Sequence, residues 1–220
     1  MIATAARVFF LIVATLFPIV DPLGGSPLFL ALTPQCSPKK CRALSWRVAL
    51  NSFWVLIASY FVGAQVLAFF GVSLPVVQVG GGLLVTSFGW SLLSQKDSPP
   101  KPVQESVSTE DLFRRAFYPL TMPITVGPGS VAVAVALGAN TAHHYGFHVL
   151  IIVADLLGIT VIALSVFLCY AFAGALARAL GETGMTIIVR LSAFILICIG
   201  VQIAWNGVNA LLSSVVFRVR

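Results

Sequence analysis

A carboxylate set between two prolines has the most evident chemistry in this sequence. Asp21 lies in the segment FPIVDP, which occupies residues 17–22 within a long apolar run. An ionisable group inside such a run is costly to desolvate, so it indicates a functional role: the carboxylate would pair with an ammonium group or carry a proton. The other interpretation is structural, because an aspartate that precedes a proline also caps the start of a helix. The sequence leaves both roles open.

A second motif repeats this spacing later in the chain. The segment YPLTMP, residues 118–123, again has an aromatic residue followed by two prolines four residues apart, with Met122 in the place of Asp21. Both motifs are followed by glycine, serine and proline, as GGSP at 24–27 and as GPGS at 127–130. Proline lacks the N–H that a helix interior needs, so both apolar runs are predicted to be broken helices.

The predicted breaks suggest a binding site. We expect the first break at Pro22 and Pro27. Ser26, before Pro27, and Gly127, before Pro128, would cap the new half-helices. Free N–H groups and the helix dipole at such starts favour an anion such as a carboxylate, and glycines let a ligand approach the backbone. The structural alternative is a pair of proline kinks that neighbouring helices accommodate. The predicted substrate-binding residues at the breaks are Asp21, Gly24, Gly25, Ser26, Gly127, Gly129 and Ser130.

Two more polar residues lie inside apolar runs at corresponding places in the two halves of the chain. Asn51 is in the second run and Asp155 is in the fifth. If the halves are related, both side chains face the same interior and belong to the predicted substrate site. The alternative is that they form interhelical hydrogen bonds that only hold the bundle together.

The elements that must position these residues are long apolar segments. The chain has 220 residues, of which 59% are hydrophobic and 9% are charged. A soluble domain has about 25% charged residues, and a chain of this length cannot bury so much apolar surface in a globular core. Each apolar run is long enough to cross about 30 Å of hydrocarbon. The runs lie near residues 6–32, 46–70, 73–94, 116–139, 147–172 and 185–212. These patterns predict an all-α membrane protein with a lipid bilayer as its solvent.

The six runs divide into two groups of three. Residues 1–94 hold the first group, residues 115–220 hold the second, and the polar stretch 95–114 reads as a cytoplasmic linker. Three is an odd number, so the two groups cross the membrane in opposite directions. The sequence therefore predicts a 3+3 inverted repeat whose first and fourth helices are broken. Secondary transporters use this plan and bind their substrate near the midplane, between the broken helices.

Basic residues predict the orientation. They gather in the first, third and fifth connections, which the positive-inside rule places in the cytoplasm. Both termini are then periplasmic. The same distribution over short connections excludes a nucleic-acid surface, despite the formal charge of +6. The basic residues of these connections are Lys39, Lys40, Arg42, Lys96, Lys101, Arg114, Arg115 and Arg178.

The remaining candidate groups suggest no further chemistry. His143, His144 and His148 have no carboxylate or cysteine near them in the sequence, and Cys36 and Cys41 lack further ligands, so no metal site is predicted. The run GGG at 80–82 is interpreted as close helix packing. The chain shows no nucleophile–base pair, phosphate loop or nucleotide motif. We therefore expect neither an enzyme nor an ATP-driven pump, and no cofactor.

The two motifs also carry a family resemblance. FPIVDPLGGSPLFLALT and FYPLTMPITVGPGSVAVAVALGA resemble the signature segments of the MarC family of bacterial inner-membrane proteins, and the resemblance extends over nearly the whole chain. It implies six spans, a location in the inner membrane, and kinship with proposed neutral amino acid transporters. The resemblance also implies Asn or Asp before the second proline, which is Asp21, and Gly-Pro-Gly in the second half, which is 127–129.

These observations lead to one functional expectation and one rival. The expectation is a secondary transporter of a small solute such as a neutral amino acid, whose carboxylate would bind a half-helix start and whose ammonium group would lie near Asp21. A proton gradient or the gradient of the solute itself would drive it. The rival is a non-transporting membrane scaffold or accessory subunit, in which the broken helices are packing devices.

Overall fold

The computed structural model describes residues 1–33, 36–94, 116–145 and 148–218. The described residues form helices joined by short turns, without strands, which confirms the prediction of an all-α membrane protein. The predicted linker 95–114 lies outside the described residues. In chain order the elements are α1 (Ile2–Val20), α2 (Pro22–Leu32), α3 (Pro38–Phe69), α4 (Leu74–Ser94), η1 (Ala116–Thr125), α6 (Pro128–Tyr145), α7 (Val149–Ala171) and α8 (Ala173–Arg218).

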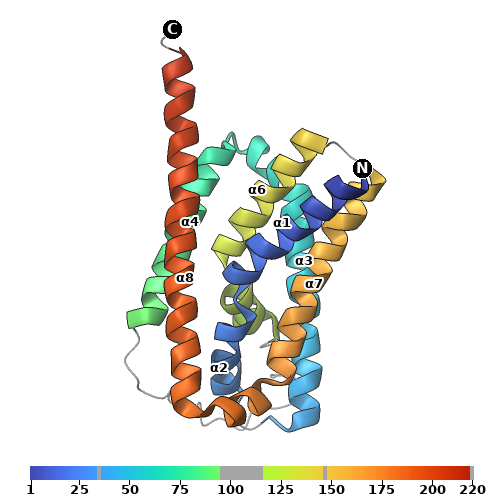
Figure 1. Ribbon diagram of the computed structural model, residues 1–220, viewed down its shortest axis with the longest axis vertical. Coiled ribbons are helices and arrows are strands. Elements are labelled where there is room, and N and C mark those ends of the chain that lie inside the picture. Colours follow the sequence, from blue (N-terminus) through green and yellow to red (C-terminus); the bar gives the residue numbers. More distant parts are fainter. Residues whose placement is uncertain (34–35, 95–115, 146–147, 219–220) are drawn as a thin grey trace.

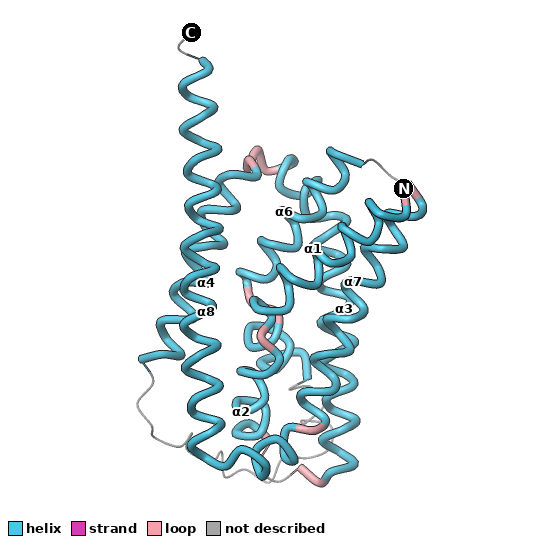
Figure 2. Tube along the Cα trace, viewed as in Figure 1, coloured by secondary structure: helices cyan, strands magenta, loops and turns pink. Residues whose placement is uncertain are grey.

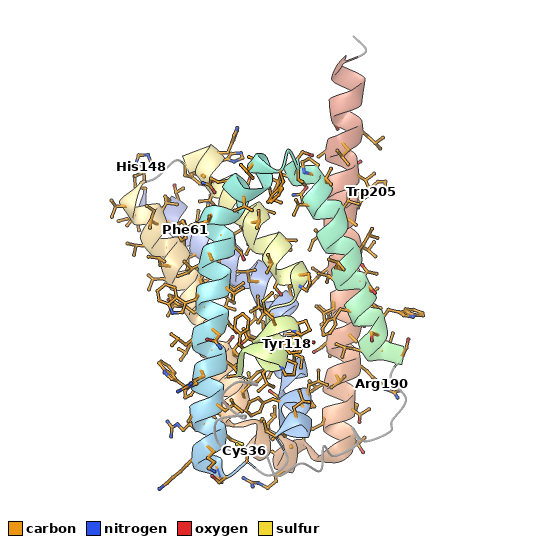
Figure 3. All side chains as sticks on the ribbon, turned by 180° about the vertical axis from the view of Figure 1, so that it is seen from behind. Cys36, Phe61, Tyr118, His148, Arg190 and Trp205 are labelled. Atoms are coloured by element: carbon orange, nitrogen blue, oxygen red, sulfur yellow. The ribbon has the colours of Figure 1, made fainter. Side chains whose placement is uncertain are left out.

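Six segments of these elements are suited to cross a bilayer. Five are long, apolar helices, of which the first, Ile2–Leu30, continues from α1 into α2. The sixth is the pair of η1 and α6, which meet at a bend of 68°. Both termini lie at one end of the molecule (Figure 1). Cys36 and Arg190 lie at the opposite end, while His148 lies at the end that holds the termini (Figure 3).

Two element boundaries differ from the sequence prediction. α3 begins at Pro38, about eight residues before the start of the run that the sequence placed at 46–70. Proline suits this position because it fits the first turn of a helix. α8 begins at Ala173 rather than near 185, but its backbone breaks at Gly181, where φ is 66°. That left-handed conformation suits glycine, which has no Cβ to clash. A short helix therefore precedes the last span.

The third helices of the two groups form an antiparallel pair. α4 and α8 lie side by side (Figures 1 and 2), and their backbones touch. A Cβ placed on Gly89 would lie 2.8 Å from the carbonyl oxygen of Ala193, and one on Gly207 would lie 2.6 Å from that of Pro75. Small residues let membrane helices approach this closely, so we describe α4 and α8 together as the α4–α8 pair.

The triple glycine of α4 takes part in this packing, as predicted. Gly82 lies against Gly200 of α8, and a Cβ on Gly200 would be 2.7 Å from the Gly82 carbonyl oxygen. Gly81 lies against Ala132 of α6. Gly80, in contrast, has no neighbouring atom within 4 Å of its Cβ position. Two of the three glycines therefore set helix separations.

The remaining spans pack around an apolar core. Ile12 of α1, Leu56 of α3 and Ile159 of α7 are fully buried. Close approach again depends on glycine: Gly138 of α6 lies directly on the Tyr60 backbone of α3, and Gly158 of α7 lies on Ile12. The core therefore joins α1, α3, α6 and α7 into one bundle, and the α4–α8 pair lies beside it (Figure 1).

Candidate functional site

The first helix break is centred on Asp21. α1 contains Pro18 but ends at Val20, and α2 begins at Pro22. Asp21 between them has φ 45° and ψ 62°, a left-handed conformation that aspartate tolerates better than most residues. Its Oδ1 accepts a hydrogen bond of 3.0 Å from the Gly24 N–H. The aspartate thus acts as the N-cap of α2, and the Ser192 hydroxyl of α8 interacts with the same carboxylate.

The prediction that Ser26 and Pro27 mark a break is wrong. Both lie inside α2, which begins earlier, at Pro22. The Ser26 hydroxyl donates to the Pro22 carbonyl at 2.8 Å and approaches the Cys169 carbonyl at 3.3 Å, so it is not a cap. Pro27 removes one N–H from the helix, a loss that a helix surrounded by other helices accommodates.

The two glycines of this motif make room for particular side chains. Gly24 lies against the Asp21 carboxylate, and a Cβ there would occupy the same space. Gly25 lies under the phenol of Tyr170 from α7 in the same way. Both glycines are buried. They therefore serve the cap and the packing of α2 on α7.

The second break has a different construction. Tyr118 and Met122 have extended backbones, each before a cis proline, and they divide η1 into two wide turns. Prolines cannot donate, and two threonine hydroxyls bond to carbonyls near them: Thr121 to Ala116 at 2.6 Å and Thr125 to Leu120 at 2.7 Å. The chain then bends by 68° into α6. Gly127 immediately precedes Pro128, the first residue of α6, as the sequence predicted.

A buried tyrosine joins the two breaks. The Tyr170 hydroxyl lies 2.9 Å from the Thr125 hydroxyl of η1. The same ring stacks on Phe29 of α2, with 4.9 Å between ring centroids, and its hydroxyl end covers Gly25. Tyr170 is 1% exposed. One side chain of α7 therefore holds both broken segments.

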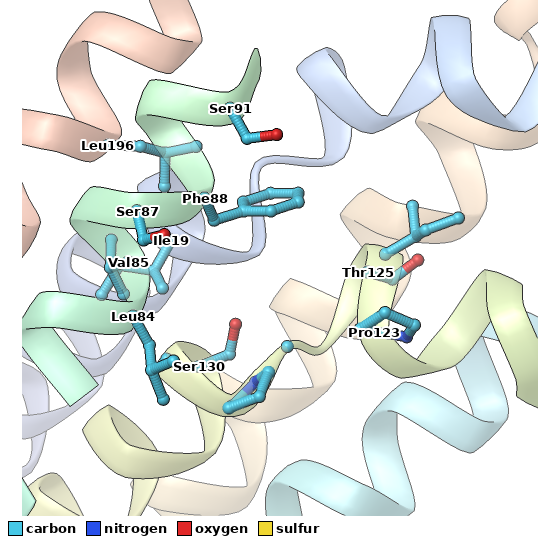
Figure 4. Close-up of a pocket in the computed structure, with 14 residues that line it drawn as sticks. Ile19, Leu84, Val85, Ser87, Phe88, Ser91, Pro123, Thr125, Ser130 and Leu196 are labelled. Carbon is cyan, nitrogen blue, oxygen red and sulfur yellow. The ribbon is translucent and has the colours of Figure 1, made fainter. Parts of the chain in front are cut away.

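A cavity of about 300 Å³ opens next to the second break, between the bundle and the α4–α8 pair (Figure 4). Apolar side chains form most of its wall, hydroxyl groups form the rest, and none of the lining residues is charged. We call this cavity the central pocket. Its lining residues are Ile19, Leu84, Val85, Ser87, Phe88, Ser91, Pro123, Ile124, Thr125, Gly127, Pro128, Gly129, Ser130 and Leu196.

Ser130 is the most informative residue of the central pocket. It lies in the first turn of α6 and is 2% exposed, and the structure gives its hydroxyl no hydrogen-bond partner among the described residues. In Figure 4 the hydroxyl points into the central pocket. Because this hydroxyl faces the cavity and bonds to no other described residue, a ligand atom in the cavity can bind to it. The N-terminal N–H groups of α6 lie at the same place.

The predicted site residues separate into three places. Gly127, Gly129 and Ser130 line the central pocket. The residues of the first motif, Asp21 and 24–26, are not among its lining residues and reach it through the contact between Tyr170 and Thr125. Asn51 and Asp155 do not line the central pocket. Asp155 accepts a hydrogen bond from Tyr60, nine residues after Asn51 on α3 and thus about 14 Å along the helix from it.

Several pocket residues were not predicted. Ser87 and Ser91 are four residues apart on α4 and share one helix face, a spacing visible in the sequence. Thr125 belongs to a repeated proline–aliphatic–threonine pattern, PLT and PIT, at 119–121 and 123–125. Tyr60 and Tyr170 carry no local signal, because their partners are far away in the sequence. Within the described residues, no group of three His, Cys, Asp or Glu side chains is placed to hold a metal ion.

Six apolar spans with two breaks at mid-height, one of them on an internal pocket, define a polytopic integral membrane protein. Sequence comparison agrees: the family described as MarC family integral membrane protein matches residues 6–212. The chain belongs to the MarC family, as the signature segments implied.

Curated relatives cover nearly the whole chain. The UPF0056 inner membrane protein MarC of Salmonella typhimurium strain LT2 is 32% identical over 206 residues, which are 90% of this chain and 93% of the relative. The proteins of the same name from Citrobacter koseri and Escherichia coli O1:K1 are each 31% identical over 205 residues, with the same coverage. No solved structure gives a significant match.

Proposed function

We propose that the protein is a secondary transporter of a small solute with no net charge, and that the solute binds in the central pocket. The observation that carries this proposal is the Ser130 hydroxyl at the start of α6, which faces a cavity of about 300 Å³ and bonds to no other described residue. A cavity of this size accommodates a small metabolite. Because no charged side chain lines the central pocket, a solute with net charge would lose its hydration without a compensating ion pair.

A neutral amino acid fits this chemistry. Its carboxylate would accept hydrogen bonds from the N–H groups at the start of α6 and from the Ser130 hydroxyl, where the helix dipole also favours negative charge. Its ammonium group would donate to hydroxyls on the opposite wall, which Ser87 and Ser91 provide. Its side chain would contact Phe88 and Leu196. Asp21 would act indirectly, by capping α2 two residues after Ile19 in the pocket wall.

The position of the central pocket supports transport rather than storage. It lies between the bundle and the α4–α8 pair, so a change in their relative position would expose it to one side of the membrane or the other. The two groups of three spans are proposed to be related by an inverted repeat, in which α4 and α8 are equivalent helices. Alternating access in transporters of that plan is a movement of one such body against another.

Transport in proteoliposomes tests the proposal. The purified protein should exchange a labelled solute from a panel of neutral amino acids without any imposed gradient. Ser130→Ala should weaken apparent affinity about tenfold or more, the usual effect of a lost hydrogen bond to a charged group. Ser59→Ala is the matched control, because this serine of α3 bonds only to its own helix, at the Val55 carbonyl.

Two results would reject the proposal. One is the absence of binding and exchange for the whole panel, which would favour the rival interpretation of a scaffold or accessory subunit. The other is an equal effect of Ser130→Ala and Ser59→Ala, which would remove the solute from the central pocket.

The orientation is also proposed, with the protein in a bacterial inner membrane and both termini in the periplasm. The basic residues Lys39 and Arg42 lie at the end of the fold opposite the termini, and this end is proposed to be cytoplasmic. Reporter fusions after Lys39 should give a cytoplasmic signal, and fusions after Tyr145 a periplasmic one. The reverse pattern would overturn the orientation.

A further inference from the structure

A second cavity lies away from the central pocket, toward the end of the bundle that holds the termini. It has a volume of about 40 Å³, enough for a water molecule. α3, α6 and α7 form its walls, and its polar groups are Tyr60, Gln65, Thr141 and Asp155. None of these residues lines the central pocket, so the two cavities are separate sites.

Asp155 is the acidic group of this second cavity. It is the seventh residue of α7, about 9 Å along the helix from its start, and it is 3% exposed. The Tyr60 hydroxyl donates a hydrogen bond of 2.7 Å to its Oδ1, and Tyr60 in turn interacts with the hydroxyl of Thr141. In the part of the chain that the structure describes, no lysine, arginine or histidine pairs with this carboxyl group.

Other titratable and charged groups near this end lie on neighbouring elements. α6 ends with His143 and His144, and His148 precedes α7; all three are exposed. α1, which packs on α7, carries Arg7 near its start, and this side chain is also exposed. α3 contributes Tyr60 alone. The buried surroundings of Asp155 are therefore neutral, whatever the state of the exposed histidines.

A carboxyl group in such surroundings has two accessible states. The ionised form is costly in an apolar interior, and a single neutral donor offsets only part of that cost. The protonated form has no such cost, and its own O–H can donate to water or to Gln65 in the second cavity. Because the Tyr60 hydroxyl supports the ionised form and the interior supports the neutral one, both states are within reach.

We propose that Asp155 is a reversible proton-binding site, reached through the second cavity from the membrane side that holds the termini, with Tyr60 as its positioning residue. The step is a proton transfer alone. An O–H bond of a hydronium ion in the cavity breaks, an O–H bond forms at the carboxylate oxygen, and a water molecule and a neutral acid remain. The proposal extends the proposed transport function, since this proton would couple the membrane gradient to solute movement.

Infrared spectroscopy of the full-length protein in lipid nanodiscs tests proton binding without any solute. The carbonyl stretch of a protonated carboxyl should appear and disappear reversibly with pH, and Asp155→Asn should abolish this titrating band. Tyr60→Phe should bind the proton about tenfold more tightly, because the ionised form loses the hydrogen bond that the Tyr60 hydroxyl donates. Ser59→Ala changes a neighbouring residue that does not line the cavity and whose hydroxyl bonds to the Val55 carbonyl. This variant should leave the band unaltered, and so should one with all three histidines replaced by glutamine.

Flux measurements separate this proposal from the transport function. If Asp155→Asn exchanges solute at the wild-type rate but no longer accumulates it under a proton gradient, the proposal is supported. If the wild type shows the titrating band but moves no solute, proton binding stands and the proposed function fails. A band that does not titrate, or one that survives in Asp155→Asn, would overturn the proposal even if transport is observed.

Discussion

The two broken segments share a proline spacing but differ in how they satisfy the backbone. At the first break, Asp21 caps the new helix: its carboxylate accepts a hydrogen bond from the Gly24 N–H, and α2 belongs to the same span as α1. At the second break, Met122 stands at the equivalent position and has no group that can cap. Threonine hydroxyls there satisfy carbonyls, and the chain bends by 68°.

The difference assigns different roles to the two motifs. A helix start with a built-in carboxylate has little capacity left for an external anion. The start of α6 has no such carboxylate, and its Ser130 hydroxyl is open to the central pocket. The comparison teaches that the residue immediately before each new helix matters: Asp21 caps α2, whereas Gly127, which precedes α6, has no side chain that could cap it. We therefore propose a structural role for the first break and place the proposed site at the second.

The largest expected effect comes from filling the space between α6 and α4 at the second break. Gly129→Val would place side-chain atoms on Val85 of α4, so it would narrow the central pocket and push α6 away. Solute exchange should fall by about a hundredfold or more, since the variant loses both shape and position at the site. Gly80→Val is the matched control, because nothing lies within 4 Å of that Cβ. Exchange at the wild-type rate in Gly129→Val would contradict solute binding at the second break.

Changes at the first break should lower the stability of the protein rather than its transport activity. Asp21→Ala removes the cap, worth about 1 kcal/mol, and places alanine in a left-handed conformation at a cost of about 1–2 kcal/mol. Thermal unfolding in detergent should therefore show a clear loss. Asp21→Asn should behave as the wild type, because asparagine caps equally well and tolerates the same backbone.

Solute affinity of the two Asp21 variants sharpens the comparison further. At equal amounts of folded protein, both should bind the solute as the wild type does. A tenfold loss of affinity in Asp21→Asn would instead show that the charge itself contacts the solute, and the first break would then belong to the site.

The smallest effect concerns the bridge between the breaks. Tyr170→Phe removes the hydrogen bond to Thr125 but keeps the ring on Phe29, so it should cost about 1 kcal/mol of stability. A double-mutant cycle with Thr125→Val should give a coupling of about 0.5–1.5 kcal/mol. The control cycle uses Thr121→Val, which loses a comparable bond within η1 but does not touch Tyr170. Equal coupling in the two cycles would mean that the bridge does not join the breaks.

Local rules predicted the architecture and half of the site. The apolar runs located all six spans, and the prolines indicated both broken helices, because span length and proline chemistry depend on neighbouring residues only. The same rule misplaced part of the first break at Pro27, since it takes no account of the cap that the Asp21 carboxylate provides to the Gly24 N–H. Gly127, Gly129 and Ser130 were found because they follow the second break directly.

What the sequence did not predict depends on contacts between distant segments. Tyr60 and Asp155 are 95 residues apart, and no local sequence pattern predicts their hydrogen bond. Asn51 matched Asp155 in position along the chain but not in its surroundings. The α4–α8 pair is an intermediate case, because Gly82 and Gly89 are seven residues apart, as are Gly200 and Gly207. That matched spacing is visible in the sequence, but only the structure shows that Gly82 faces Gly200, while Gly89 faces Ala193 and Gly207 faces Pro75.

The two helices of the α4–α8 pair differ in length, so the thickness of the bilayer affects them differently. α4 has 21 residues and is about 32 Å long, close to the hydrocarbon thickness, while the apolar part of α8, Thr183–Ser213, has 31 residues and is about 46 Å long. Beyond Gly207, which lies on Pro75 near the start of α4, α8 continues past its partner (Figure 1). In a bilayer that matches α4, hydrophobic mismatch therefore falls on α8, which must tilt, thicken the surrounding lipid or carry its apolar end into the headgroup layer. Acyl-chain length will thus act on this protein mainly through one helix.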